Sequence, residues 1–391
     1  MHRKESKISA IWFSVFTLGV AAFAMVTTEF APIGLLSQIA ANLGQPKPII
    51  GLTVTLYAWG GACSGLFAAR LAKAVDCKNL LIALLLVLAV SNFLVASSST
   101  LAALFVARAV GAVAHGIFWA LVAATATRIA PPHRMGLATS IVFGGISVAS
   151  VAGIPIVNFV GQIVGWRISF GILGVTCFLV TGLMVFALPK MTNSATENTQ
   201  FYRFIIQRKD LLPIYAVTAF TSSAHFDGYT FIEPFILRIS HISALFVSLL
   251  LLSFGAAGFV GNLISGLLSD RFIKPLVGGA LITMLLALGG LGWLGPRADF
   301  ASVLILLIVW GASIAVLFAV LQTWILFAAK SDAMVAAGLH TAVLNVSIGI
   351  GSSLGSWCLH SYGLSSVMSS AAILTLPPVF ILFFTRNDGR R

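Results

Sequence analysis

Charged side chains are scarce in this chain. Lys, Arg, Asp and Glu make up only 9% of its 391 residues, and just 11 residues are acidic. A soluble domain keeps roughly a quarter of its residues charged, whereas 59% of this chain is hydrophobic and its mean hydropathy is +1.03. The composition excludes an ordinary soluble protein and predicts one that is embedded in a lipid bilayer.

Several catalytic and ligand-binding signatures are also missing. The 4 cysteines show no C-x-x-C spacing, so neither a disulfide framework nor a metal site is predicted. The chain has no H-E-x-x-H pair for an embedded metal-dependent hydrolase and no G-x-x-x-x-G-K-S/T loop for a nucleotide-driven pump. We therefore expect no enzyme activity and no cofactor.

Long apolar stretches follow one another along the whole chain, each close to the roughly 20 residues that a helix needs to cross a bilayer. The twelve stretches lie at 10–36, 48–70, 79–96, 101–127, 137–162, 166–188, 211–237, 243–268, 274–294, 301–328, 333–357 and 363–385. The predicted fold class is an all-α membrane protein with twelve transmembrane helices.

Basic residues are concentrated on alternate loops. Of the 23 Lys and Arg, only Lys47, Arg167, Arg238 and Arg297 lie on the side opposite the N-terminus, and Arg108 lies in the middle of a span. The remainder share the N-terminal side, so the positive-inside rule predicts that both termini are cytoplasmic. The formal net charge of +12 is thus a topology signal. Because the charges are scattered over several loops, no nucleic-acid partner is predicted.

The polar segment 189–210 separates six spans from six, as a linker between two halves would. The halves echo one another, because Glu29 and Glu233 each precede a proline near the outer end of the first span of their half. A duplicated six-helix unit is the architecture of many secondary transporters. We therefore expect an N-terminal half at 1–188 and a C-terminal half at 211–391.

Short sequence motifs make the prediction of a secondary transporter more specific. At the end of the eighth span, Gly266, Asp270 and Arg271 have the spacing of the loop motif of the major facilitator superfamily, and the chain resembles that family. Gly153 and Pro155 in the fifth span are similar to the antiporter motif of its drug/proton antiporter branch. Four further stretches resemble bacterial sugar efflux transporters of the SotB type, and they lie at 27–36, 114–119, 229–235 and 345–351.

The resemblance implies a monomeric carrier of the bacterial inner membrane. Such a carrier exports small sugars or sugar-like solutes, of the arabinose and thiogalactoside class, in exchange for protons by alternating access. Gly266, Asp270, Arg271, Gly153 and Pro155 would then act in the conformational switch. A multidrug/proton antiporter of the same fold is the alternative, and composition does not separate the two.

Seven ionisable side chains lie inside the bilayer, away from the ends of the predicted spans, where each costs about 2.5–3.5 kcal/mol on insertion scales and normally faces a cavity or a partner. They are Glu29, Arg108, His115, His225, Asp227, Glu233 and His340. With a helical rise of about 1.5 Å per residue, Glu29 and Arg108 reach similar depths, so we predict that they pair across the first and fourth spans. The pair is either part of the proton-coupling site or a fixed contact between two helices.

Polar and aromatic residues share one face of the fourth span. Arg108, His115 and Trp119 recur at helical spacing, with Phe118 beside them. A cation, an imidazole and an indole on one stripe suit a hydroxyl-bearing ligand, so His115, Phe118 and Trp119 are predicted substrate contacts. The alternatives are a structural histidine and a packing indole.

The seventh span repeats this pattern. His225, Tyr229 and Glu233 stand at i, i+4 and i+8 and share a face, whereas Asp227 lies about 160° from Tyr229 around an undistorted helix. His225 and Tyr229 are predicted substrate contacts, and Glu233 and Asp227 are predicted proton-coupling acids ranked after Glu29. Asp227 is alternatively a buried residue paired with a donor from the tenth or eleventh span.

Tyr57, Gln322 and Asn345 complete the predicted substrate contacts. Phenol and amide groups are chemically suited to sugar hydroxyls and faces. The alternative role of each is hydrogen bonding between helices or packing in the core.

Overall fold

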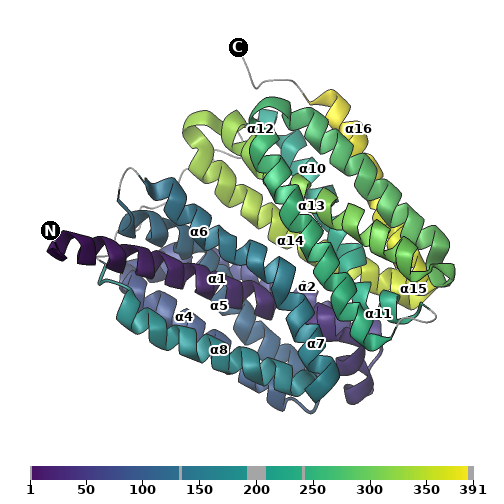
Figure 1. The fold of residues 1–391 in the computed structure, drawn as a ribbon, viewed down its shortest axis with the longest axis horizontal. Coiled ribbons are helices and arrows are strands. Elements are labelled where there is room, and N and C mark those ends of the chain that lie inside the picture. The colour runs from purple at the N-terminus through teal and green to yellow at the C-terminus, as the bar shows by residue number, and fades with distance from the viewer. Residues whose placement is uncertain (1, 132–133, 192–207, 240–242, 386–391) are drawn as a thin grey trace. The chain divides into compact units, whose positions relative to one another are not determined.

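The computed structural model of the chain describes residues 2–131, 134–191, 208–239 and 243–385, and every regular element in those ranges is a helix (Figure 1). Most of the predicted linker 189–210 therefore lies outside the described residues. The elements are α1 (His2–Leu43), α2 (Lys47–Gly65), α3 (Ala68–Ala74), α4 (Cys77–Ser97), α5 (Leu101–Ile129), α6 (Met135–Val148), the π-helix η2 (Ala149–Gly153), α7 (Ile154–Val164), α8 (Trp166–Ala187), η3 (Lys209–Leu211), α10 (Leu212–Tyr229), α11 (Ile232–Leu237), α12 (Ala244–Leu294), η4 (Gly295–Arg297), α13 (Phe300–Ala329), η5 (Lys330–Asp332), α14 (Ala333–Tyr362), α15 (Leu364–Leu374) and α16 (Leu376–Phe384).

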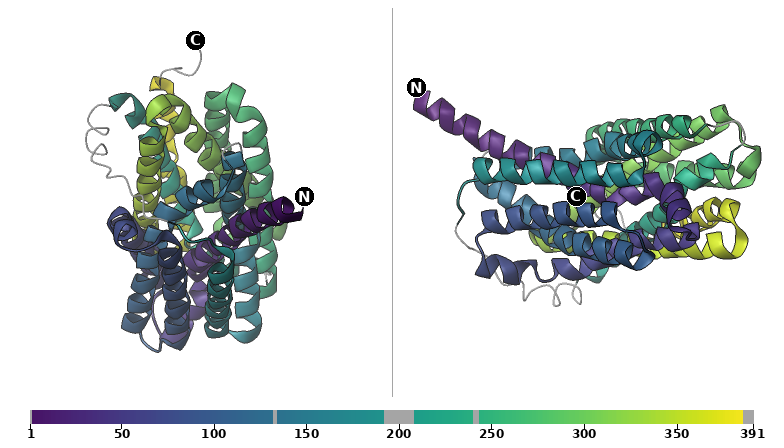
Figure 2. Two further views of the ribbon diagram at one scale, coloured as in Figure 1. Left: turned by 90° about the vertical axis from the view of Figure 1, so that its left-hand side faces the viewer. Right: turned by 90° about the horizontal axis from the view of Figure 1, so that it is seen from below.

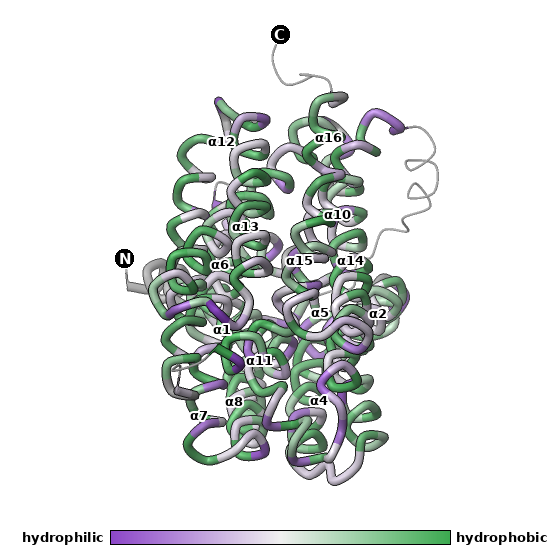
Figure 3. Tube along the Cα trace, turned by 90° about the vertical axis from the view of Figure 1, so that its right-hand side faces the viewer, coloured by the Kyte–Doolittle hydropathy of each residue, from purple (hydrophilic) through white to green (hydrophobic). Residues whose placement is uncertain are grey.

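The prediction of an all-α membrane protein is confirmed. Among the described residues, 10 helical segments are long and apolar enough to cross a membrane, and each overlaps one predicted span. The predicted spans at 48–70 and 211–237 are also helical, but α2 has only 19 residues and α10 only 18. Hydrophobic residues run along the helices, while hydrophilic ones gather mainly at helix ends and loops (Figure 3). The protein is therefore a multi-pass membrane protein.

Two predicted spans meet within α12. The chain passes from the eighth span to the ninth at Phe272, whose backbone is non-helical with φ −132° and ψ 41°. Pro275 follows and removes one main-chain donor, which favours a break at this place. The loop motif that begins at Gly266 thus lies on a sharp kink between two helices.

The chain forms two compact units. The first comprises Met1–Ala31 and Leu56–Glu197, and the second comprises Pro32–Thr55 and Asn198–Arg391. In the first unit α4 packs against α5 and α8, around a core of buried apolar side chains. In the second unit α12 packs against α13 and α15, while α10 packs against α14 and α15. Figure 2 shows the helices from two further sides, with α1 running unbroken from the N-terminal end.

The second unit includes a hairpin from early in the chain, Pro32–Thr55, which joins the end of α1 to the beginning of α2. Two serines of α14 fasten it. Ser352 Oγ donates to the carbonyl of Gly51 at 3.0 Å, and Ser356 Oγ donates to the carbonyl of Pro48 at 2.8 Å. The hairpin is therefore bound by side chains that come from the end of the sequence.

Arg208 anchors the entry to α10 at the end of α13. Its guanidinium donates to the carbonyls of Ala328 and Ala329 at 2.7 and 3.1 Å, and to the carboxylate of Asp332 at 2.9 Å. It also donates to Asp210, and this hydrogen bond holds the pKa of that carboxyl below its usual range. One cation thus satisfies carbonyls that a helix C-terminus leaves without main-chain donors.

Glycine allows α2 and α5 to approach closely in the first unit. A Cβ atom on Gly116 would lie 1.9 Å from the carbonyl oxygen of Gly61 and 2.3 Å from Ser64 Oγ. We expect Gly116→Ala to lower the free energy of unfolding by about 3 kcal/mol, since overpacking costs about 1–3 kcal/mol and a helix backbone yields little. Thermal denaturation in detergent measures this. Gly144→Ala is the control, because its Cβ would meet no atom of the described residues within 4 Å. Equal melting temperatures for Gly116→Ala and Gly144→Ala would contradict the close approach of α2 and α5.

Candidate functional site

Arg108 of α5 is fully buried and binds the main chain of α1. Its Nη1 donates to the carbonyl of Thr28 at 2.8 Å, and its Nη2 donates to the carbonyl of Glu29 at 2.7 Å. The Thr28 carbonyl needs this donor, because the residue four positions later is Pro32, which has no N–H. The guanidinium also lies 3.9 Å from the ring centroid of Tyr57. Arg108 therefore repairs a proline-induced gap in the hydrogen bonds of α1.

The carboxylate of Glu29 lies beside a different residue. Glu29 Oε2 is 3.6 Å from His115 Nε2, and both side chains are buried. Arg108 and Glu29 do lie together, as their similar depths predict, but the guanidinium donates to the main-chain carbonyl of Glu29. Glu29 and His115 are close enough to exchange a proton after a small movement or through one water molecule.

The polar stripe of α5 continues to Trp119. The rings of His115 and Trp119 lie 6.1 Å apart, and Trp119 stacks on Phe143 of α6 at 6.2 Å with an interplanar angle of 9°. Tyr57 contacts His115 edge to face at 5.1 Å. Phe118 differs from its neighbours, because it is fully buried within the apolar core of the first unit. Tyr57, His115 and Trp119 thus form one aromatic wall, and Phe118 packs behind it.

A second cluster, which we call the aromatic box, surrounds His225 in the second unit. His225 stacks on Tyr229 at 4.7 Å, as their i, i+4 spacing predicts. Phe254 of α12 and Trp310 and Phe318 of α13 lie 6.1, 5.5 and 5.8 Å from the imidazole. The sequence reasoning missed these three residues, and their only signal is an aromatic ring in a predicted span. His225 Nδ1 and Trp310 Nε1 are buried and have no hydrogen-bond partner among the described residues.

Glu233 lies beyond a break in the seventh span. The seventh span breaks after α10, with α11 beginning at Ile232, because Pro234 can give no N–H to the carbonyl of Thr230. Beyond the break, Glu233 Oε2 accepts a hydrogen bond at 3.0 Å from the backbone N–H of Ser37 in the hairpin. The seventh span is therefore not the single undistorted helix on which the predicted face through His225 and Glu233 depends.

Asp227 is fully buried and finds its partner on α15. Ser370 Oγ lies 2.7 Å from Asp227 Oδ2 and can also donate to the carbonyl of Val367 at 2.9 Å. The expected alternative partner was a donor from the tenth or eleventh span, whereas Ser370 belongs to the twelfth. Since a hydroxyl has one proton, Asp227 and Ser370 can satisfy both acceptors when Asp227 is protonated.

The antiporter-like motif lies at a π-helix. Gly153 ends η2, and Pro155 occupies the first turn of α7, where its missing N–H is tolerated. A Cβ on Gly153 would lie 2.5 Å from Thr27 Oγ1 of α1. Gly153 and Thr27 line a cavity of about 110 Å³ among α1, α7 and α8. A π-helix marks an irregular helix that often serves function, so the predicted switch residues lie where the fifth span is least regular.

The remaining polar residues singled out in the sequence lie on α13 and α14. Gln322 is half-buried on α13, and Asn345 of α14 donates at 3.0 Å to the carbonyl of Thr341 in its own helix. His340 is buried on α14, and neither of its ring nitrogens has a hydrogen-bond partner among the described residues.

The loop motif lies at the kink of α12. Gly266 is exposed, and Arg271 lies exposed with its guanidinium 5.4 Å from the ring of Phe272. The side chain of Asp270 lies outside the described part of the chain. The predicted switch role of these residues thus stays a prediction.

Comparison with known proteins gives one family and several related folds. The model of the Major Facilitator Superfamily matches residues 17–325 and 211–391. Among solved structures, a bacterial homolog of the human lysosomal transporter Spinster, inward-facing and unoccupied, gives a TM-score of 0.80 at 13% identity, over 96% of this chain and 97% of that chain. The same homolog in its inward-facing, occupied conformation gives 0.75 at 14% identity, over 98% and 96%.

A mutant of the nucleoside transporter NupG gives a TM-score of 0.77 at 14% identity, covering 96% of this chain and 99% of that chain. At such low identity these likenesses concern the fold alone. The match nevertheless extends over nearly the full length of both chains, so it includes all the helices that carry the candidate residues.

Proposed function

The chain belongs to the Major Facilitator Superfamily, a family of membrane transporters, and from this premise we propose that it is a proton-coupled carrier. It exports small sugars or sugar-like solutes across the bacterial inner membrane by alternating access. We further propose that residues 1–188 and 211–391 act as its two halves. The resemblance to sugar efflux transporters supports this substrate class.

One structural observation carries the proposal: buried polar atoms that have no hydrogen-bond partner in the described part of the chain lie next to aromatic rings. They are Tyr57 Oη and His115 Nδ1 in the first unit, and His225 Nδ1 and Trp310 Nε1 in the second. An unsatisfied buried polar group costs about 1–3 kcal/mol, so such groups recur where a polar ligand completes them. Hydroxyl groups supply the missing hydrogen bonds, and the neighbouring rings suit the C–H faces of a sugar.

The geometry around Glu29 supports proton coupling. With Glu29 ionised, His115 neutral and Arg108 charged, the three groups are neutral overall. Binding one proton on Glu29 or His115 leaves an unbalanced positive charge in a buried site, which is costly until water or packing changes around it. Proton uptake is therefore linked to conformation, as exchange of a proton for a substrate requires.

The alternative substrate class is a planar, apolar cation, as for a multidrug/proton antiporter. The aromatic box favours it, since five rings within about 6 Å of one imidazole, that of Phe226 included, resemble a cation–π site. Sugar export leads because the unpartnered nitrogens of His225 and Trp310 call for polar groups on the ligand.

Everted membrane vesicles test the proposal. Uptake of labelled arabinose, a labelled thiogalactoside and a cationic dye is measured with a proton gradient that is acidic inside the vesicles. Each measurement is repeated after an ionophore has collapsed the gradient. We expect gradient-dependent uptake of the two sugars and little uptake of the dye. Vesicles without the protein are the control. Gradient-driven uptake of the dye alone would replace sugar export by drug export, and uptake unaffected by the ionophore would exclude proton coupling.

We expect both termini and the 189–210 segment to be cytoplasmic, because the basic residues gather on that side. Single cysteines introduced at Ser194 and at Gln45 should then react from opposite sides of the membrane. A membrane-impermeant maleimide added to intact spheroplasts measures this, after the native cysteines are replaced. Labelling of the Ser194 variant from outside would reverse the topology.

A further inference from the structure

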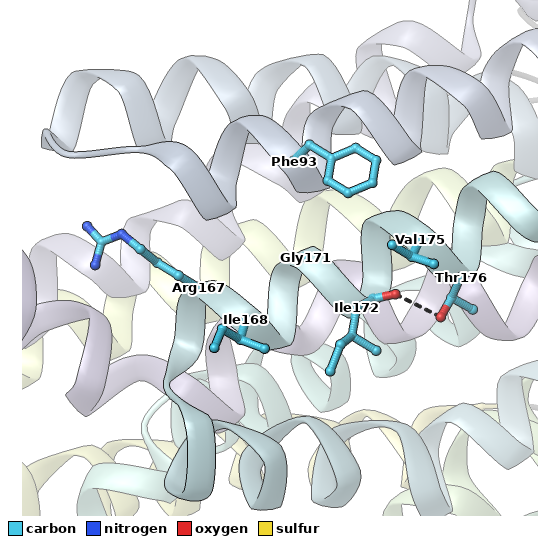
Figure 4. Close-up of a pocket in the computed structure, with 7 residues that line it drawn as sticks. All are labelled: Phe93, Arg167, Ile168, Gly171, Ile172, Val175 and Thr176. Carbon is cyan, nitrogen blue, oxygen red and sulfur yellow. Dashed lines mark hydrogen bonds between the residues drawn. The ribbon is translucent and has the colours of Figure 1, made fainter.

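A surface groove of about 510 Å³ lies along α8 in the first unit, facing Phe93 of α4 (Figure 4). The residues of α8 that line it recur at helical spacing and form one face of the helix. They are Arg167, Ile168, Gly171, Ile172, Val175 and Thr176. Apart from Arg167 the lining is apolar, since the Thr176 hydroxyl is turned back to the carbonyl of Ile172 at 2.8 Å.

The groove faces the bilayer. Phe93, Ile168, Ile172 and Val175 are all exposed, although they lie on two membrane-spanning helices. Gly171 deepens the groove, because a Cβ at this position would meet no atom of the described residues within 4 Å. An apolar hollow of this kind, on a helix surrounded by lipid, matches the chemistry of an acyl chain.

Arg167 lies at the end of the groove where α8 begins, and therefore at the membrane surface. Its Nη2 donates to the carbonyl of Ser98 at the end of α4, at 2.8 Å, and its guanidinium lies 4.2 Å from the ring of Trp166. These contacts hold the guanidinium in place. It is also one of the few basic residues on the side opposite the predicted cytoplasmic one. A fixed guanidinium is well suited to phosphate oxygens.

The two ends of the groove fit the two parts of one lipid. Arg167 and Thr176 are separated by about 14 Å along the helix axis, which is about half the thickness of the hydrocarbon core. A headgroup bound at Arg167 would therefore direct its acyl chain along the groove within a single leaflet. We propose that this groove binds an anionic phospholipid, with the phosphate at Arg167 and one acyl chain over Gly171.

Native mass spectrometry of the delipidated full-length protein tests the proposal, using phosphatidylglycerol and phosphatidylcholine of identical acyl chains. We expect the wild type to prefer phosphatidylglycerol about tenfold, which is equivalent to about 1.4 kcal/mol. Arg167→Gln should remove the preference while phosphatidylcholine binding persists. Gly171→Leu should weaken the binding of both lipids, because its side chain fills the groove. Melting temperatures establish that the variants fold.

Two matched variants are the controls. Gly182→Leu adds the same side chain to α8 at another site where a Cβ meets nothing within 4 Å, and Arg297→Gln removes another basic residue expected on the same side. Both should bind lipid as the wild type does. Equal lipid affinities for Arg167→Gln and the wild type would overturn the proposal.

Two other occupants are outcomes of the same measurement. Glycerol phosphate that binds as tightly as phosphatidylglycerol would indicate a site for a free anion and not for a lipid. A protein dimer that disappears in Gly171→Leu would assign the groove to a second copy of the chain. Either result would also overturn the proposal.

Discussion

Glu29→Gln is expected to abolish proton-driven accumulation of substrate while passive exchange continues. The amide is nearly isosteric with the carboxyl group, but it can neither release a proton nor exchange one with His115, which lies 3.6 Å away. Exchange requires only reorientation of the loaded carrier, whereas uphill transport requires coupled protonation. A coupling of about 3 kcal/mol corresponds to a loss of accumulation of roughly 100-fold. Everted vesicles measure uphill uptake, and preloaded vesicles without a gradient measure exchange.

Glu233→Gln and Asp227→Asn are the matched comparisons. Glu233 is bound to the hairpin through Ser37, and Asp227 to α15 through Ser370, so each has a hydrogen-bond partner of its own in the second unit. We rank them second and third as coupling acids. If all three amide variants keep full uphill transport, no membrane carboxylate is the coupling site. If Glu29→Gln also loses exchange, its role is structural.

Arg108→Leu is expected to lower the free energy of unfolding by about 2–6 kcal/mol. The substitution leaves the carbonyls of Thr28 and Glu29 without their donor, and each unsatisfied buried group costs about 1–3 kcal/mol. The Thr28 carbonyl has no main-chain substitute, because Pro32 stands four residues later. The free energy of unfolding of Arg108→Lys should lie between those of the wild type and Arg108→Leu, since one ammonium cannot reproduce the planar fork of a guanidinium.

Thermal denaturation of the purified protein in detergent measures these differences. Arg271→Leu serves as the control, because Arg271 is exposed and should be replaced at little cost. A melting temperature for Arg108→Leu equal to that of the wild type would show that these main-chain bonds contribute no stability. A measurement of uphill transport by Arg108→Lys would show in addition whether a positive charge, without the guanidinium fork, is sufficient for coupled transport.

The sequence predicted the helices well, because each span is an apolar run that ends at a polar or glycine-containing turn. The fourth span was expected at 101–127 and the structure has α5 at Leu101–Ile129. The i, i+4 relation of His225 and Tyr229 also follows from helical geometry alone. Local regularity of this kind needs no knowledge of the neighbouring helices.

What the sequence could not give is how the helices face one another. Their similar depths in the bilayer predict that Arg108 and Glu29 lie near each other. Whether the guanidinium binds a carboxylate or a carbonyl depends on how each helix is rotated about its axis. Likewise Phe254 and Trp310 join His225 from helices that are distant in sequence. The break in the seventh span before Glu233 arises from Pro234. Long-range packing decides each of these contacts.

The hairpin Pro32–Thr55 has a consequence for how the protein is made. Ser352 and its acceptor Gly51 are separated by 301 residues, so the ribosome makes the acceptor long before the donor. At roughly 5–20 residues per second, this interval lasts about 15 to 60 s. During that time the hairpin has left the ribosome without the α14 serines that later fasten it. The second unit therefore completes its structure only near the end of synthesis, and a chain that stops before α14 leaves this hairpin without those bonds.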